Sequence, residues 1–255
     1  DIPERFENMA GHNKWSKIKR KKAANDSKKG ANFSKLSREI QVATREGGPD
    51  PEANIRLRLA VDRAKRDGMP NDTIERAIAR ASGATSDADS FETVFYEGYG
   101  PGGFAVMAVA LTDNRNRTAA EVRNAFSRNG GSLGETGSVA WQFDTVGQIV
   151  IPANGNDPDE IALMAIDAGA TDVETDDEEI VVTTDPTDLT GVAEALRELD
   201  IEISDMTITR LPQTPMDLDP AKAASAMRML EALEDLDDVN EVYTNANFAE
   251  EAVTV

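Results

Sequence analysis

The sequence contains no cysteine and only one histidine, His12, among its 255 residues. Without cysteine the chain can form neither a disulfide nor a thiolate zinc site, and one histidine cannot complete a Cys/His metal site. A serine nucleophile would need a histidine base, and His12 lies in a basic N-terminal segment unsuited to that role. We therefore expect a protein that is not an enzyme and that uses no metal and no cofactor.

Long hydrophobic runs are also missing. No apolar run approaches the ~20 residues that a membrane helix needs, and the N-terminus lacks the apolar segment of a secretory signal. We therefore expect a soluble cytoplasmic protein that has neither a membrane partner nor a small-molecule substrate. The first eight residues, DIPERFEN, fit no periodic pattern, and we interpret them as an addition in front of a natural start at Met9.

Positive charge is scarce except near the N-terminus. The net charge is -20, with 47 acidic and 27 basic residues. Residues 9–38 nevertheless hold ten Lys and Arg residues, whereas only eight follow Arg80. Such asymmetry indicates that one part of the chain meets a polyanion while the rest stays away from it. The alternative is an unstructured basic tail in solvent.

Helical periodicity marks the first third of the chain. Phe33, Leu36, Ile40 and Ala43 recur at helical spacing, and the pattern ends at residues 47–49. A second helix is predicted from Pro51, with Asp50 as its cap, to Gly68, and a third over residues 73–82, capped by Asn71 or Asp72. Three amphipathic helices of this kind form a bundle. Its outward faces are predicted to carry further cations, namely Arg45, Arg56, Arg58, Arg63, Lys65, Arg66, Arg76 and Arg80.

A polar linker at residues 84–90 separates these helices from segments of a different period. Residues 91–97 and 104–112 are predicted strands, followed by a helix that starts at Thr118, where Thr118 and Glu121 fit a capping box. Another strand is predicted over residues 138–143. A later helix and strand, at residues 219–236 and 240–244, are expected to return and complete the sheet that begins at Phe91.

Residues 147–210 show the order strand, helix, strand, strand, helix, strand, which is the ferredoxin-like arrangement. We therefore predict an α+β protein with a three-helix N-terminal domain and two α/β domains, one ferredoxin-like and inserted in the other. The predicted boundaries are 9–83 for the basic helical domain, 84–144 together with 211–255 for the central domain, and 145–210 for the acidic insertion.

Two sequence motifs resemble ligand-binding sites, but the predicted elements around them do not fit such sites. Gly98, Gly100 and Gly103 match G-x-G-x-x-G, but a strand follows them rather than the helix that a dinucleotide site requires. A glycine-rich hairpin loop is the better interpretation. The acidic residues 175–179 lack the spacing and central glycine of a calcium loop, which favours a solvated hairpin turn.

Arg115 and Arg117 lie just before the helix predicted at Thr118. Unpaired amides and the helix dipole favour an anion at a helix start, so these arginines could help to hold a phosphate there. The alternative is that they pair with local acids or bridge domains.

The basic N-terminal segment interleaves cations with Trp15 and Ile18, a pattern that suits nucleic acid because lysines neutralise phosphates and an aromatic ring can stack on a base. Trp15 could instead anchor this segment to the helical bundle. About six neutralised phosphates would lower affinity on the order of a thousandfold between 50 and 200 mM salt. The candidate nucleic-acid-binding residues are Lys14, Trp15, Lys17, Lys19, Arg20, Lys21, Lys22, Lys28, Lys29, Lys35, Arg115 and Arg117.

Several unusual blocks occur in a characteristic order: MAGHNKWSKIKRKK, IERAI, YEGYGPGG, LTDNRNRTAAEVR and NGGSLGETGSVAWQF. Together they resemble the YebC/PmpR family, which includes a mitochondrial translational activator of cytochrome oxidase subunit I. The resemblance implies three domains and no enzymatic activity. It also implies a cytoplasmic transcriptional regulator that binds DNA, although the mitochondrial branch and some bacterial members look like translation factors acting at the ribosome.

Two function classes remain open from the sequence. The first is a nucleic-acid-binding regulator of gene expression, whose target is promoter DNA or ribosomal RNA; an extended basic segment and the lack of an evident recognition helix favour RNA, whereas the family resemblance favours DNA. The second is a protein-interaction module in which the acidic domains bind a basic partner. An enzyme is disfavoured by the scarcity of catalytic residues.

Overall fold

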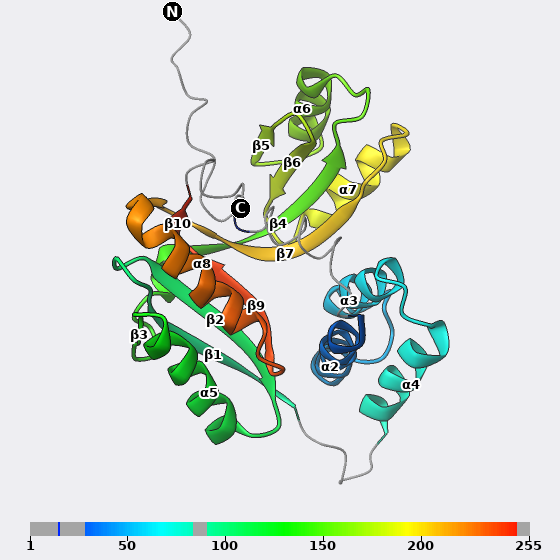
Figure 1. Cartoon of the computed structure of the whole chain (residues 1–255). Helices are drawn as coiled ribbons and strands as arrows, with labels where there is room; N and C mark the ends of the chain where they lie inside the picture. Colours follow the sequence, from blue (N-terminus) through cyan, green and yellow to red (C-terminus); the bar gives the residue numbers. More distant parts are fainter. Residues whose placement is uncertain (1–14, 16–28, 84–90, 249–255) are drawn as a thin grey trace, which may run out of the picture. The chain divides into compact units, whose positions relative to one another are not determined.

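The computed structural model describes residue 15, residues 29–83 and residues 91–248 of the chain (Figure 1). It shows an α+β protein with an N-terminal helical region and two α/β parts, as predicted. In the described part of the chain, no helix combines the length and apolar character required to span a bilayer.

The helical region consists of α2 (Lys29–Gly47), α3 (Ile55–Arg66) and α4 (Asn71–Ser82). Their apolar stripes meet in one core, which explains why three helices with short connections are stable together. Buried members of that core include Leu36, Ile40, Ala43, Leu57, Ala64, Ile74 and Ala77. The three predicted helices are confirmed, but the predicted cap of the third is wrong, because α4 follows Pro70 and already includes Asn71 and Asp72.

The start of α3 differs from the prediction. Asn54, not Asp50, caps this helix: its Oδ1 accepts from the amide of Leu57 at 3.1 Å, while its Nδ2 donates to the carbonyl of Ala43 at 2.8 Å. Asp50 instead accepts from the amide of Glu52 in the preceding turn. Asn54 is the cap because its buried carboxamide can both donate to a carbonyl at the end of α2 and accept from an amide at the start of α3. The carboxylate of Asp50 can only accept.

The central sheet has the order β3-β1-β2-β9. It contains β1 (Glu92–Tyr99), β2 (Ala105–Thr112), β3 (Ser132–Leu133) and β9 (Val239–Thr244). Helices α5 (Arg115–Arg128) and α8 (Pro220–Glu234) pack beside each other and share a hydrophobic core with this sheet. Strand β8 (Met216–Asp217) pairs with β10 (Ala246–Asn247). The predicted return of the C-terminal helix and strand to this sheet is confirmed.

Two elements near the sheet were predicted incorrectly. Helix α5 begins at Arg115, where the side chain of Asn114 accepts from the amide of Arg117, so Thr118 is inside the helix rather than its cap. Of the strand predicted at residues 138–143, Phe143 alone lies in a strand, and residues 138–142 do not. They contain the 3-10 turn η1 (Ala140–Gln142), because the amides of this segment bind the carboxylate of Glu97 instead of a neighbouring strand.

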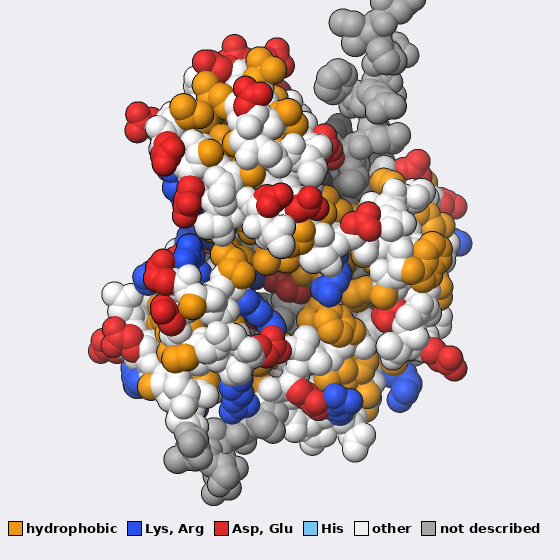
Figure 2. Space-filling model, turned by 180° about the vertical axis from the view of Figure 1, so that it is seen from behind, with side chains coloured by type: hydrophobic (Ala, Val, Ile, Leu, Met, Phe, Trp, Pro, Cys, Tyr) orange, Lys and Arg blue, Asp and Glu red, His pale blue; other side chains and the backbone are white. Residues whose placement is uncertain are grey.

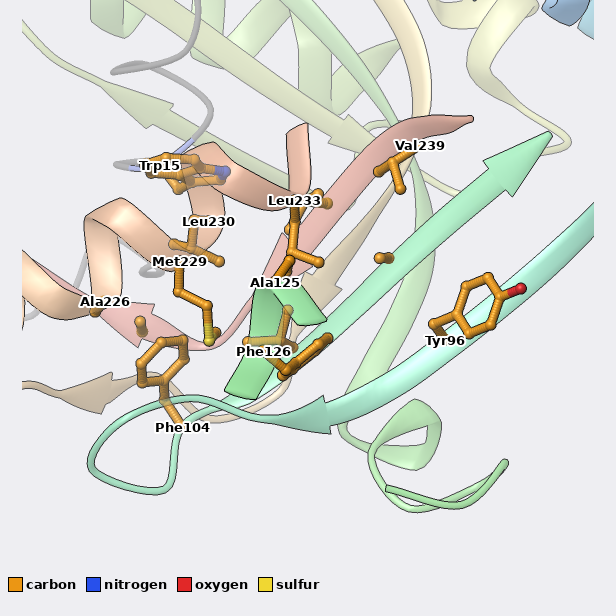
Figure 3. Close-up of a cluster of buried hydrophobic side chains, with 14 of the residues drawn as sticks. Trp15, Tyr96, Phe104, Ala125, Phe126, Ala226, Met229, Leu230, Leu233 and Val239 are labelled. Atoms are coloured by element: carbon orange, nitrogen blue, oxygen red, sulfur yellow. The ribbon is translucent and has the colours of Figure 1, made fainter. Parts of the chain in front are cut away.

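The hydrophobic core of the central domain joins both helices to the sheet (Figure 3). Phe104 and Phe126 are fully buried against Met229 of α8 and its neighbours. The glycine-rich segment before Phe104 is the hairpin loop between β1 and β2, with Gly102 and Gly103 at positive φ. The hairpin interpretation is therefore confirmed.

Residues 143–211 form a compact unit of their own. Its strands are β4 (Phe143–Pro152), β5 (Asp172–Thr175), β6 (Glu179–Thr184) and β7 (Asp205–Pro212), in the sheet order β5-β6-β4-β7. With α6 (Pro158–Asp167) and α7 (Leu189–Glu198) this is the predicted ferredoxin-like arrangement. The acidic residues between β5 and β6 form a hairpin turn, in which Asp176 accepts from the amides of Glu178 and Glu179.

Helices α6 and α7 end in the same way but with different residues. In each, a backbone amide just beyond the helix donates to a carbonyl in its last turn. The amide of Ala170 donates to the carbonyl of Ala165 at 2.9 Å, and the amide of Ile201 donates to the carbonyl of Leu196 at 3.1 Å. The residue before that amide has positive φ, which is Gly169 after α6 and Asp200 after α7. Glycine adopts this conformation without strain, whereas Asp200 is the one non-glycine residue with positive φ in the described part of the chain.

This difference predicts opposite effects of two substitutions. Asp200→Gly should raise the free energy of unfolding by about 0.5 kcal/mol, because relief of strain exceeds the added freedom of the unfolded chain. Gly169→Ala should lower it by about 1 kcal/mol. Urea denaturation followed by circular dichroism measures both, and a change of the same sign in the two variants would contradict the strain argument.

Candidate nucleic-acid interface

Most of the basic residues predicted to bind phosphate lie outside the described residues. This group comprises Lys14, Lys17, Lys19, Arg20, Lys21, Lys22 and Lys28. Lys29 is the first residue of α2, and its side chain is not described either. Phosphate contacts by these eight residues therefore stay a prediction.

Trp15 is buried, which corrects its predicted role as a base-stacking residue. Only 2% of its surface is exposed, and its ring lies 6.1 Å from that of Phe248 at a tilt of 37°. It belongs to the core of the central domain, near Leu230 of α8 (Figure 3). The alternative of an anchoring role fits better, although the anchor is this core rather than the helical bundle. Burial of the indole stabilises the fold and leaves no ring face for a base.

Lys35 is used within the protein. Its ammonium donates to the carbonyl of Glu234, the last residue of α8. A cation at that position is favourable because the last carbonyls of a helix carry partial negative charge. This contact joins α2 to the central domain and occupies a donor that was predicted to bind phosphate.

Arg115 and Arg117 also have acidic partners, which corrects their predicted place before the helix and their role as a phosphate site. They lie in the first turn of α5, where Arg115 forms a two-point ion pair with Glu92. Arg117 donates to Asp113 at 2.7 Å and to Asp238 at 2.6 Å. Both guanidinium groups are thus paired with carboxylates of the chain itself, and the side chain of Asn114 accepts from the amide of Arg117, so the alternative of local pairing holds.

Asp238 is the centre of a hydrogen-bond cluster between elements far apart in sequence. It precedes β9, and its side chain is 3% exposed. Besides Arg117, its Oδ2 lies 2.7 Å from the hydroxyl of Thr118 and 3.2 Å from that of Thr112. Its Oδ1 accepts from Arg38 of α2 at 3.1 Å. The cluster therefore links β2, α5 and β9 with the helical region.

The cluster also sets the ionisation of Asp238. Burial alone would raise the pKa of its carboxyl group, but hydrogen bonds from Arg117 and Thr118 and the charges of Arg117 and Arg38 outweigh burial. The pKa therefore lies below the ordinary value for aspartate, and Asp238 is ionised at neutral pH.

Several other cations of the helical region are paired in the same manner. Arg56 contacts Glu39 and Glu46, while Arg63 donates to Glu241 of β9 at 2.6 Å. Arg58 pairs with Glu52 at 2.9 Å. Figure 2 shows Lys and Arg side chains interspersed with carboxylates over the lower part of the molecule. Three of the eight outward cations predicted from the sequence, Arg56, Arg58 and Arg63, are thus compensated by carboxylates of the chain itself.

A second buried carboxylate was not singled out by the sequence. Glu97 of β1 is 3% exposed and accepts three backbone amides, from Gly137 at 2.7 Å and from Val139 and Ala140 at 2.8 Å each. These bonds fix the loop that presents Trp141, whose side chain is 68% exposed. A charged residue at an inward position of a strand was the only sequence signal for it.

Three amide donors decide the ionisation of Glu97. Burial would raise the pKa of its carboxyl group, yet the hydrogen bonds from Gly137, Val139 and Ala140 together hold it below the ordinary value. The loop is thus held by an ionised group, which ties its order to pH.

Comparison with known proteins identifies this arrangement. The model for the TACO1/YebC N-terminal domain matches residues 13–84, and that for the TACO1/YebC second and third domain matches residues 91–246. A probable transcriptional regulatory protein of Thermomicrobium roseum is 63% identical over 243 residues, covering 95% of this chain and 98% of the relative. A protein of Rubrobacter xylanophilus with the same description is 49% identical, covering 96% and 98%.

A solved structure agrees with this result. The crystal structure of a conserved hypothetical protein from Aquifex aeolicus superposes with a TM-score of 0.81 at 45% identity, covering 88% of this chain and 93% of the other. The two family models together match residues 13–84 and 91–246, and the relatives align with nearly the whole chain. The chain therefore belongs to the TACO1/YebC family.

Proposed function

We propose that this protein is a non-catalytic, cytoplasmic regulator of gene expression that binds DNA through its basic N-terminal residues. The observation that carries the proposal is the concentration of ten cations in residues 9–38 of a chain with net charge -20. The names of its relatives, probable transcriptional regulatory proteins, support a role in transcription.

Charge pairing elsewhere in the chain sharpens this proposal. At least six described arginines form ion pairs with the protein's own carboxylates: Arg38, Arg56, Arg58, Arg63, Arg115 and Arg117. A guanidinium committed to a carboxylate gives little net attraction for a phosphate chain. The positive charge for nucleic acid is therefore assigned to residues 14–29, which follow each other closely in sequence. Lysines there would neutralise phosphates and release counterions.

RNA at the ribosome is the second candidate target, with a role in translation. Helices α3 and α4 are joined by a short turn, as in a helix-turn-helix unit, in which the second helix would enter the major groove with its N-terminal residues. In α4 those residues include Asp72 and Glu75, which are exposed. Carboxylates at that place would be repelled by the phosphates that flank the groove, so α4 is poorly suited to read duplex DNA. An extended basic segment suits a structured RNA instead.

A salt series distinguishes these targets and tests the basic segment. The wild-type chain and the variant Lys19→Glu/Lys21→Glu/Lys22→Glu are titrated with duplex DNA, with a ribosomal RNA fragment and with intact ribosomes between 50 and 200 mM salt. We expect the variant to bind its preferred target at least about tenfold more weakly at 150 mM salt, with the slope of log K against log salt smaller by about 2.7 for duplex DNA, or 0.9 per lost contact.

The matched control reverses the same number of charges elsewhere. Arg123→Glu/Arg128→Glu/Arg228→Glu changes three exposed cations on α5 and α8. Its slope should equal that of the wild type within error. Equal weakening in both triple variants, or none in the first, would overturn the assignment to the basic segment. Tighter binding to ribosomal RNA or ribosomes than to DNA at every salt concentration would select the translation role.

A further inference from the structure

Helix α6 exposes two large aliphatic side chains where a surface helix normally shows polar ones. Leu163 is 69% exposed and Ile166 is 49% exposed. They are three residues apart and therefore adjacent on one helix face. The opposite face of α6 already supplies the core, through the buried Ile161 and Ala165. Leu163 and Ile166 are therefore not needed to hold α6 against the core, and they expose apolar surface to water.

Carboxylates surround this apolar pair. Asp159, Glu160 and Asp167 are exposed residues of the same helix, and the helical period places them around Leu163 and Ile166 on the outward face. Helix α7 packs beside α6 and is followed by Leu199, which is 53% exposed. We call Asp159, Glu160, Leu163, Ile166 and Asp167 the α6 face.

The whole unit that carries the α6 face is strongly acidic. Residues 143–211 contain eighteen Asp and Glu residues but only two basic ones, Arg197 and Arg210. Figure 2 shows the lobe formed by this unit, with hydrophobic side chains between carboxylates and few cations. Mutual repulsion of so many like charges lowers the stability of a small domain, and their summed field gives the surface around α6 a negative potential.

The negative charge around the α6 face limits which partners could bind there. Nucleic acid and anionic lipid would both be repelled, and a second copy of the same unit would bring eighteen further carboxylates. A cationic protein segment would instead be attracted, and its apolar side chains could cover Leu163 and Ile166. An amphipathic helix presents apolar and basic residues at the required spacing.

We propose that the α6 face is a docking site for a cationic amphipathic helix of a protein partner. The apolar pair supplies the contact that excludes water, and the surrounding carboxylates pair with Lys and Arg at its rim and raise the association rate. This role is separate from nucleic-acid binding, because it uses a different unit of the chain and a charge of the opposite sign.

The test uses a synthetic helix-forming peptide of leucine and lysine, with the leucines on one face, as the probe. A control peptide has the same composition in an order that distributes the leucines around the helix. The full chain is titrated with each peptide at several salt concentrations, and nitrogen–proton NMR spectra locate the binding. We expect the first peptide to shift the amide resonances of α6 and to bind at least tenfold more tightly than the second.

Two variants separate the apolar contribution from the charge contribution. Leu163→Ser/Ile166→Ser should weaken binding of the first peptide at least tenfold and keep the salt dependence. Asp159→Asn/Glu160→Gln/Asp167→Asn should reduce both the affinity and the salt slope. The matched control Glu194→Gln/Glu198→Gln/Asp200→Asn removes three carboxylates from α7 and its end, and should change affinity less than threefold. Circular dichroism shows whether each variant keeps its helices.

Four results would overturn the proposal. They are equal binding of the two peptides, NMR shifts outside α6, equal weakening by the α6 and α7 charge variants, and no effect of the double serine variant. Two further measurements address other occupants of the face. Self-association of the wild type in sedimentation, abolished by the double serine variant, would assign the α6 face to a second copy. Flotation with phosphatidylcholine vesicles that depends on Leu163 would assign it to a lipid surface.

Discussion

Asp238→Ala is expected to lower the free energy of unfolding by about 3 kcal/mol, because it removes the shared acceptor of a buried cluster. Thr112 and Thr118 would lose the carboxylate acceptor that they share in the core, and Arg38 would lose its ion pair but keep its bond to the carbonyl of Asp237. Arg117 is 44% exposed, so water can solvate part of its charge, which places the expected loss at the low end for a broken buried pair. Calorimetry should show a melting temperature roughly 6–12 °C lower.

The neighbouring residue provides the control. Asp237 has the same side chain and an exposed position, and only its backbone carbonyl is used. Asp237→Ala should change the free energy of unfolding by no more than about 0.5 kcal/mol. Similar losses in the two alanine variants would mean that the cluster around Asp238 does not stabilise the fold.

The acid response of the Asp238 cluster has a defined sign. Because the folded state lowers the pKa of this carboxyl group, its stabilising contribution is complete above the unfolded pKa and disappears as the pH falls through the folded pKa. The difference in the free energy of unfolding between the wild type and Asp238→Ala should therefore become smaller as the pH is lowered. A gap that widens below pH 4 would contradict the assignment of an ionised Asp238.

The fold was largely predictable because hydrophobic periodicity is a local property. The helical stripe from Leu36 to Ala43 and the run of β-branched residues at 180–184 each specify an element with no knowledge of the rest of the chain. The return of residues 239–244 to the first sheet could also be inferred, since a lone strand needs a partner. These inferences need only sequence order and the requirement that apolar faces be covered.

The details that were predicted incorrectly depend on contacts between residues distant in sequence. Asn54 caps α3 because it also bonds to Ala43, eleven residues earlier, and Asp238 pairs with Arg117 across 121 positions. No local pattern encodes such a choice between possible partners. Trp15 illustrates the same limit, since its neighbours in sequence are cations while its ring contacts Phe248 near the other end of the chain.

The candidate site shows the consequence for function. A count of cations shows where positive charge is concentrated in the sequence, but it could not tell an arginine paired with a carboxylate from an unpaired one. Arg115 and Arg117 satisfied every local criterion for anion binding, yet Glu92, Asp113 and Asp238 had already supplied the anion. Predictions of phosphate sites from sequence therefore need the acidic partners as well as the donors.

Glu97→Gln is expected to release the loop before Trp141 without unfolding the protein. The carboxylate accepts three amides, whereas a carboxamide offers one oxygen and turns its own donors toward the remaining amides. Loss of charged hydrogen bonds of this kind costs about 2 kcal/mol, and local opening should become about thirtyfold more frequent. Hydrogen exchange at Gly137, Val139 and Ala140 measures this directly.

Glu135→Gln is the matched control, since Glu135 lies in the same loop and is exposed. It should leave exchange at the three amides within about threefold of the wild type, whereas similar acceleration in both variants would show that Glu97 has no special part in ordering the loop. The wild type should also lose its protection on acidification. Because the folded state lowers the pKa of Glu97, its stabilising contribution is complete above the unfolded pKa and is lost as the pH falls through the folded pKa. Exchange rates corrected for intrinsic pH dependence should therefore converge with those of Glu97→Gln below that range, because a protonated Glu97 accepts these amides no better than the carboxamide does.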